Sequence, residues 1–77
     1  MGKLGPREVI VILNSLPLNE LSRVDGELER AREALLGMGQ EELGQRVEEA
    51  RRRLREGQLK DFRRTVATVT ARLGHVK

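Results

Sequence analysis

The sequence predicts an all-α protein, in which a short N-terminal helix and three heptad-patterned helices form a hairpin or a bundle. Along three successive segments, apolar residues recur at alternating steps of three and four residues, as on one face of a helix. Glycines separate these segments, and the apolar pattern changes phase at each separation. We expect a single domain over residues 1–77. Its predicted helices span about 6–15, 18–37, 40–56 and 58–73, and a tail follows at 74–77.

The first helix is predicted from a start signal at Gly5 and Pro6. Proline favours the first position of a helix because its fixed backbone angle suits the helix and its missing N–H is not needed there. The run Val9 to Leu13 is rich in β-branched residues and also fits a strand. No later segment reads as a strand that could pair with it, so a helix is the preferred interpretation.

The second helix follows a turn at residues 16–19, where either Pro17 begins the helix or Asn19 caps it. Gly26 lies inside this helix on the face opposite the apolar residues, where it costs about 1 kcal/mol relative to alanine. The apolar positions form an a/d seam that is narrower than the stripe of an ordinary globular helix. They are Leu21, Val24, Leu28, Ala31, Leu35 and Met38.

Two further helices follow, each after a glycine that breaks the apolar pattern. Gly37 and Gly39 precede the third helix, and Gly57 precedes the fourth. The connections are short, so consecutive helices should run antiparallel as neighbours. The apolar positions of the third helix are Leu43, Val47, Ala50 and Leu54. Those of the fourth are Leu59, Phe62, Val66, Val69, Leu73 and Val76.

The length of 77 residues limits the size of the core. Because the chain contains no cysteine, disulfides cannot supplement that core, which leaves dense helix packing and self-association. We therefore expect dimerisation to complete the fold, with the partner being a second copy or another helical protein. Abundant Arg and Glu are typical of thermophilic proteins, although a GC-rich genome gives the same composition.

The composition argues against catalysis. His75 is the single histidine and lies near the end of the chain, where a shielded catalytic or metal site is not expected. The acids fall off the apolar seams, and no serine has a histidine nearby in the sequence. We expect no enzyme activity, no cofactor, no metal and no small-molecule ligand.

A membrane role is not expected either. The sequence contains neither a secretory signal nor the roughly 20 apolar residues of a membrane span, and the apolar face of the last helix is mainly valine. These features, with the absence of cysteine, favour a cytoplasmic location.

Positive charge gathers around the turn at Gly57. The net charge of +3 arises entirely after Met38. Acids at helical spacing offer partners to Arg46, Arg52, Arg53 and Arg64. The cations left without an obvious local acid are Arg51, Arg55, Lys60 and Arg63. These four could contact phosphates, but a solvated, ion-paired face is the favoured interpretation, because no exposed aromatic residue is expected for base stacking.

Residues 57–67 carry a local resemblance. Gly57-Gln58-Leu59, followed by Asp61-Phe62-Arg63-Arg64-Thr65-Val66-Ala67, resembles the second helix of a small helical-hairpin protein of the large ribosomal subunit. The resemblance covers a short part of the chain, needs a gap after Leu59, and consists mostly of heptad positions. It adds some support to RNA binding and is not adopted as a family assignment.

The favoured function is therefore a small helical module for protein–protein interaction or oligomerisation. Its predicted interaction seam consists of Leu21, Leu28, Leu35, Leu59, Phe62, Val66, Val69 and Leu73. The alternative is a nucleic-acid-binding or ribonucleoprotein accessory protein that uses Arg51, Arg55, Lys60 and Arg63.

Overall fold

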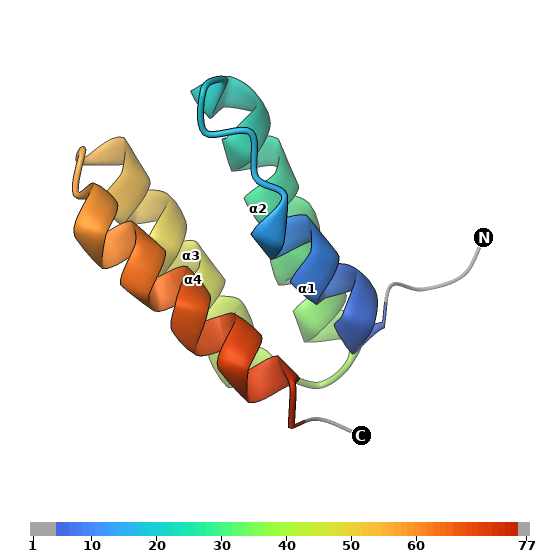
Figure 1. Ribbon diagram of the computed structural model, residues 1–77. Coiled ribbons are helices and arrows are strands. Elements are labelled where there is room, and N and C mark those ends of the chain that lie inside the picture. The colour runs from blue at the N-terminus through green and yellow to red at the C-terminus, as the bar shows by residue number, and fades with distance from the viewer. Residues whose placement is uncertain (1–4, 76–77) are drawn as a thin grey trace.

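The chain folds into four α-helices, shown in Figure 1 for a computed structural model that describes residues 5–75. They are α1 (Pro6–Asn14), α2 (Leu21–Gly37), α3 (Glu41–Arg55) and α4 (Leu59–Leu73). No strand occurs within residues 5–75, so the all-α prediction is confirmed. The β-branched run at residues 9–13 forms part of α1, with Val9 and Leu13 buried one helical turn apart and Val11 exposed between them.

The helix ends follow the sequence signals closely at α1, α3 and α4. Pro6 occupies the first turn of α1, and the backbone N–H of Gly5 donates to Oε1 of Glu8 at 2.9 Å. Gly39 and Gly57 have φ angles of 78° and 76°, a left-handed conformation that glycine adopts without steric cost. Each follows a helix end that is closed by paired backbone hydrogen bonds, such as Gln40 N to Leu35 O at 2.8 Å.

The start of α2 differs from the sequence prediction. The helix begins at Leu21, three residues later than the expected residue 18. The N–H of Glu20 donates to the carbonyl of Pro17 at 2.8 Å, which closes a turn over residues 17–20. The carbonyl of Glu20 is then the first acceptor of the helix, for the N–H groups of Arg23 and Val24. The connection between α1 and α2 is consequently an irregular segment, residues 15–20, that contains this turn.

The four helices form a ring in which each contacts its neighbours in the chain and α1 also contacts α4. Figure 1 shows the α1–α2 hairpin beside the α3–α4 hairpin, with the short α1 and α4 on the near side. Within residues 5–75, the diagonal pairs α1–α3 and α2–α4 make no backbone contact. The arrangement is thus a small antiparallel bundle, 32 × 24 × 17 Å in extent.

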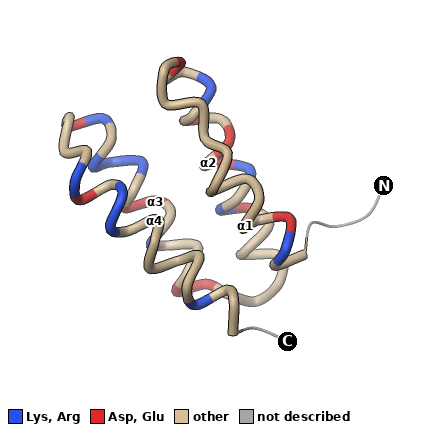
Figure 2. Tube along the Cα trace, viewed as in Figure 1, with Lys and Arg blue, Asp and Glu red and all other residues tan. Residues whose placement is uncertain are grey.

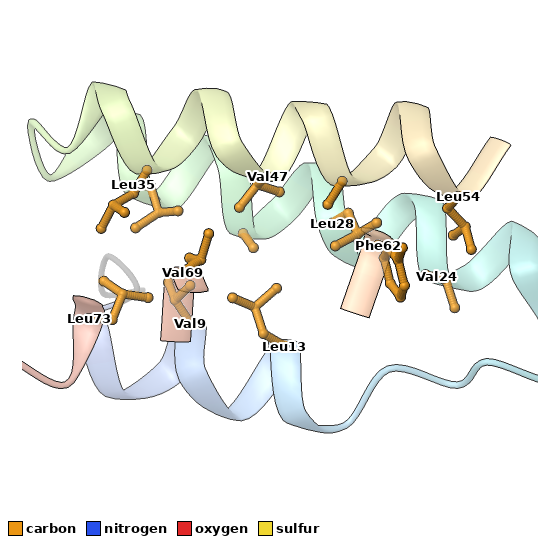
Figure 3. Close-up of a cluster of buried hydrophobic side chains, with 13 residues drawn as sticks. Val9, Leu13, Val24, Leu28, Leu35, Val47, Leu54, Phe62, Val69 and Leu73 are labelled. Carbon is orange, nitrogen blue, oxygen red and sulfur yellow. The ribbon is translucent and has the colours of Figure 1, made fainter. Parts of the chain in front are cut away.

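The core is aliphatic apart from Phe62 and contains no buried polar or charged residue among those described. Figure 3 shows Phe62 toward the Leu54 and Val24 end of the cluster, whereas Val69 and Leu73 lie toward Val9 at the other end. Every helix contributes to the cluster, so the single chain closes a core of its own. The buried residues are Val9, Leu13, Val24, Leu28, Ala31, Leu35, Leu43, Val47, Ala50, Leu54, Phe62, Val69 and Leu73.

Candidate interaction surface

Most of the predicted interaction seam lies inside the bundle. Leu28, Leu35, Phe62, Val69 and Leu73 are buried, and the partly buried Val66 packs against them. The seam residues of different helices therefore pack on one another within the chain. Val76, assigned to the same pattern, lies outside the described residues.

The first seam residue of α2 and that of α4 are exceptions. Leu21 remains 56% exposed and Leu59 remains 50% exposed, so neither belongs to the buried cluster. Each begins its helix. A seam position in the first turn has no preceding turn beside it, and it is covered only where a neighbouring helix extends past it. These two side chains are therefore available at the surface of the monomer.

An apolar groove lies beside Phe62, between α4 and the segment that follows α1. Its volume is about 280 Å³. Leu13, Leu16 and Leu18 line it from one side, and Phe62, Val66 and Ala67 line it from α4. Asn14, Arg63 and Thr70 complete the lining. The sequence gives no signal for this groove, because Leu16 and Leu18 lie on the irregular segment 15–20 and the rest of the lining comes from two helices that are distant in sequence.

The groove exists because α1 is short. At 1.5 Å per residue, the 9 residues of α1 span about 14 Å, whereas the 15 residues of α4 span about 22 Å. Beyond Asn14, the irregular segment 15–20 takes the place that another helical turn would occupy. Its side chains cover Phe62, which is 2% exposed, but Leu18 on the same segment stays 40% exposed. The surface at this end of the bundle is thus hollow and partly apolar.

Arg51, one of the four predicted phosphate contacts, is paired with acids of its own chain. Its side chain is only 14% exposed and binds acids on two helices. Its guanidinium donates Nε to Asp25 Oδ1 at 3.1 Å, Nη1 to Glu29 Oε1 at 2.6 Å and Nη1 to Glu48 Oε1 at 2.9 Å. The acids of α2 lie opposite it because α2 and α3 pack side by side. A bidentate contact with one carboxylate fixes the guanidinium plane and removes it from solvent.

The contacts around Arg51 shift the pKa values of the groups that take part in them. The pKa of Asp25 is lowered from its ordinary value of 3.8, chiefly by the hydrogen bonds that it accepts from Arg51. The pKa of Glu29 is lowered from 4.5, chiefly by hydrogen bonds from Arg32. The pKa of Arg51 is raised by its hydrogen bonds with Asp25. We name the group Asp25, Glu29, Arg32, Glu48 and Arg51 the α2–α3 ion network.

The other predicted phosphate contacts differ from one another. Arg55 is exposed, and its Nη2 lies 3.6 Å from Asp25 Oδ1, so it has an acid nearby that the sequence did not reveal. Lys60 and Arg63 are exposed on α4 and form no ion pair with any residue from 5 to 75. Figure 2 shows the cations gathered on α3 and α4 toward their shared turn.

Three cations assigned to local acids form no ion pair within the described part of the chain: Arg46, Arg52 and Arg64. Glu42 pairs with Arg72 instead of Arg46, and Glu48 is turned toward Arg51 and Arg32 instead of Arg52. Glu49 does pair with Arg53 at 3.5 Å, as its spacing predicts. Near the α3–α4 turn, the exposed cations without an ion pair among residues 5–75 are therefore Arg52, Lys60, Arg63 and Arg64, so Arg52 and Arg64 replace Arg51 and Arg55 of the predicted set.

Across residues 5–75 no cluster of potential metal ligands is present, and no helix is long and apolar enough to cross a membrane. His75 is exposed after the end of α4. Comparison with known proteins finds no family model, no curated protein and no solved structure that matches this chain. Its function is therefore argued from the residues themselves.

Proposed function

We propose that this chain is a non-catalytic protein–protein interaction module that docks a helical partner at the groove beside Phe62. The observation that carries the proposal is the groove itself, whose largely apolar lining includes the exposed Leu18. Leu59 lies outside the lining, half exposed and one turn before Phe62 and Arg63 on the same face of α4. Concave apolar surfaces rimmed by polar groups are typical of sites where proteins receive a partner.

Self-association remains part of this proposal, but its basis changes. The sequence favoured a dimer because narrow seams leave a core incomplete. In the structure, however, four helices bury thirteen hydrophobic residues within one chain. A second copy is therefore not needed to close the core, and any contact between copies would use the exposed side chains at the groove.

The proposal is tested with tagged protein in a lysate of the source organism and with purified protein by light scattering. The parent should retain a partner protein or self-associate as concentration rises. Leu18→Glu should abolish this interaction without unfolding the chain, because Leu18 lines the groove and is 40% exposed. Leu59→Glu should weaken it as well, because the half-exposed Leu59 lies one turn before Phe62 and Arg63 on the same face of α4. Val11→Glu is the matched control, since Val11 is similarly exposed on α1 but does not line the groove. The proposal is contradicted if the parent stays monomeric and captures no protein. It is also contradicted if Leu18→Glu and Leu59→Glu associate as well as the parent.

Nucleic-acid binding is the second candidate, and the unpaired basic surface is the observation that favours it. Arg52, Lys60, Arg63 and Arg64 are exposed and lie near the α3–α4 turn. Contacts from these cations to phosphates would make affinity fall steeply with salt. The measurement is binding of labelled RNA and DNA at two salt concentrations by the parent and by Lys60→Glu/Arg64→Glu. Salt-insensitive or absent binding removes this candidate.

A further inference from the structure

The groove beside Phe62 lies where a fourth helix is missing from the ring. At the end of the bundle nearest Leu54, α2, α3 and α4 occupy three corners of the ring, and the fourth is crossed only by the irregular segment 15–20. The residues of α4 that line it, from Phe62 to Thr70, span about two helical turns. A helix laid along α4 would continue the line of α1 and complete the ring by ordinary helix–helix packing.

The charge at the groove is of one sign. Arg63 is the single charged residue in the lining, and it forms no ion pair with residues 5–75. Lys60, one turn earlier on α4, is likewise exposed and unpaired within that range. By contrast, the hollow of about 310 Å³ between α1 and α2 is lined by both Arg23 and Glu27. An occupant that carries carboxylates beside its apolar face would complement the groove, and a basic occupant would be repelled.

The same charges disfavour a second copy as the occupant. A symmetric pair of chains would place groove against groove, and residues near the twofold axis would meet their own counterparts. Arg63 and Lys60 of one copy would then approach Arg63 and Lys60 of the other, and these like charges would repel. The acids Glu20 and Glu27 of α2 each have an arginine of their own chain as partner. The groove is therefore better matched to a different protein.

We infer that the groove binds an acidic amphipathic helix of another protein. Apolar side chains of that helix, spaced i, i+3 or i+4 and i+7, pack against Leu18, Val66 and Ala67, which are exposed or partly exposed in the lining, and a carboxylate on its flank pairs with Arg63. The inference rests on the proposed function and specifies the class of partner.

The test uses the full chain and two labelled synthetic peptides of about four helical turns. Both carry leucines at the same helical spacing, but one has glutamates on its flanks and the other has lysines. Fluorescence anisotropy at low and moderate salt gives the affinities. The acidic peptide should bind at least about tenfold more tightly than the basic one, and added salt should narrow the difference. Arg63→Glu should reverse the preference. Arg64→Glu, the same change on the next residue of α4 outside the groove lining, should leave the preference in place.

Several outcomes overturn the inference. Equal affinity for the two peptides, or binding of neither, shows that charge does not select the occupant. Tighter binding of labelled single-stranded RNA than of the acidic peptide, lost in Arg63→Glu, identifies nucleic acid as the ligand. Self-association that Leu59→Glu disrupts identifies a second copy. A last outcome is that the parent captures a protein partner that Leu59→Glu does not capture, and yet binds the two peptides with equal affinity. In that case the proposed function stands, and the inference that the partner helix is acidic is wrong.

Discussion

At the scale of single residues, Phe62 joins the core to the groove. It is the single aromatic residue of the chain, and it is buried between α4 and the segment that follows α1. Phe62→Ala would leave a cavity at the end of the bundle where the fourth helix is missing. The expected loss of unfolding free energy is about 3 to 5 kcal/mol, large for a domain of this size. Urea denaturation followed by circular dichroism measures it, and Leu59→Ala, at a half-exposed position on the same helix, is the control. Similar midpoints for the two variants would mean that Phe62 does not support the core.

Arg51 supports the contact between α2 and α3. Arg51→Met keeps the apolar stem but leaves Asp25 and Glu29 without the guanidinium that lies between them. Because these acids are partly exposed, solvent screens the loss, and the expected destabilisation is about 1 kcal/mol. Arg52→Met, which removes an exposed arginine that has no ion pair within residues 5–75, should change stability little. Equal urea midpoints for the two variants would show that the α2–α3 ion network contributes nothing measurable.

The same network predicts how stability depends on pH. The folded-state pKa of Asp25 lies below its ordinary value of 3.8, so its contribution is fully present above that value and is lost as pH falls through the lower folded value. The free energy of unfolding of the parent should therefore decrease on acidification below about pH 4. Arg51→Met should show a smaller decrease over the same range, since Arg51 is the main cause of the shift. Parallel pH profiles for the two proteins would contradict this assignment.

At the scale of helices, two exposed glycines should respond in opposite directions to the same substitution. Gly26 lies within α2, and a Cβ atom there would meet nothing within 4 Å. Gly26→Ala should stabilise the protein by about 0.5 to 1 kcal/mol through helix propensity. Gly57 also has open space around it but a φ of 76°. Gly57→Ala should destabilise by about 1 to 2 kcal/mol, because an L-residue is strained in that conformation. Thermal unfolding measures the stability of both variants. If the two substitutions shifted the melting temperature in the same direction, the difference predicted between Gly26 and Gly57 would be wrong.

The helices were predictable because their signals are local. Pro6 at the start of α1, and Gly39 and Gly57 after α2 and α3, mark ends through backbone geometry that neighbouring residues determine. The start of α2 was not predictable to the residue, because Pro17 and Asn19 both fit a helix start whereas the structure closes a turn at Glu20. Several capping arrangements at one turn differ little in free energy, and tertiary packing selects among them.

The candidate site was less predictable because it depends on contacts between distant residues. Arg51 and Asp25 are 26 positions apart, so a search for acids three or four residues away could not pair them. The groove likewise combines Leu16 and Leu18 with Phe62 and Val66, segments that only the closing of the ring brings together. Most apolar residues at the predicted heptad positions are buried, but Leu21 and Leu59 are exposed, because spacing alone does not show which positions neighbours from the same chain cover.

At the scale of the whole molecule, stability should be distributed unevenly around the ring. Helix α1 has 9 residues and contributes only Val9 and Leu13 to the buried set, whereas α3 has 15 residues and contacts α2 and α4 along its length. Local opening of α1 therefore breaks fewer contacts than opening of the α2–α3 pair.

Amide hydrogen exchange measured by NMR should show faster exchange in α1 than in the middle of α3. Because the groove lies at the end of α1, the binding of a partner helix should slow exchange around Leu13 more than around Val47. Uniform protection across the four helices would mean that the ring opens only as a unit and that α1 is not its weakest side.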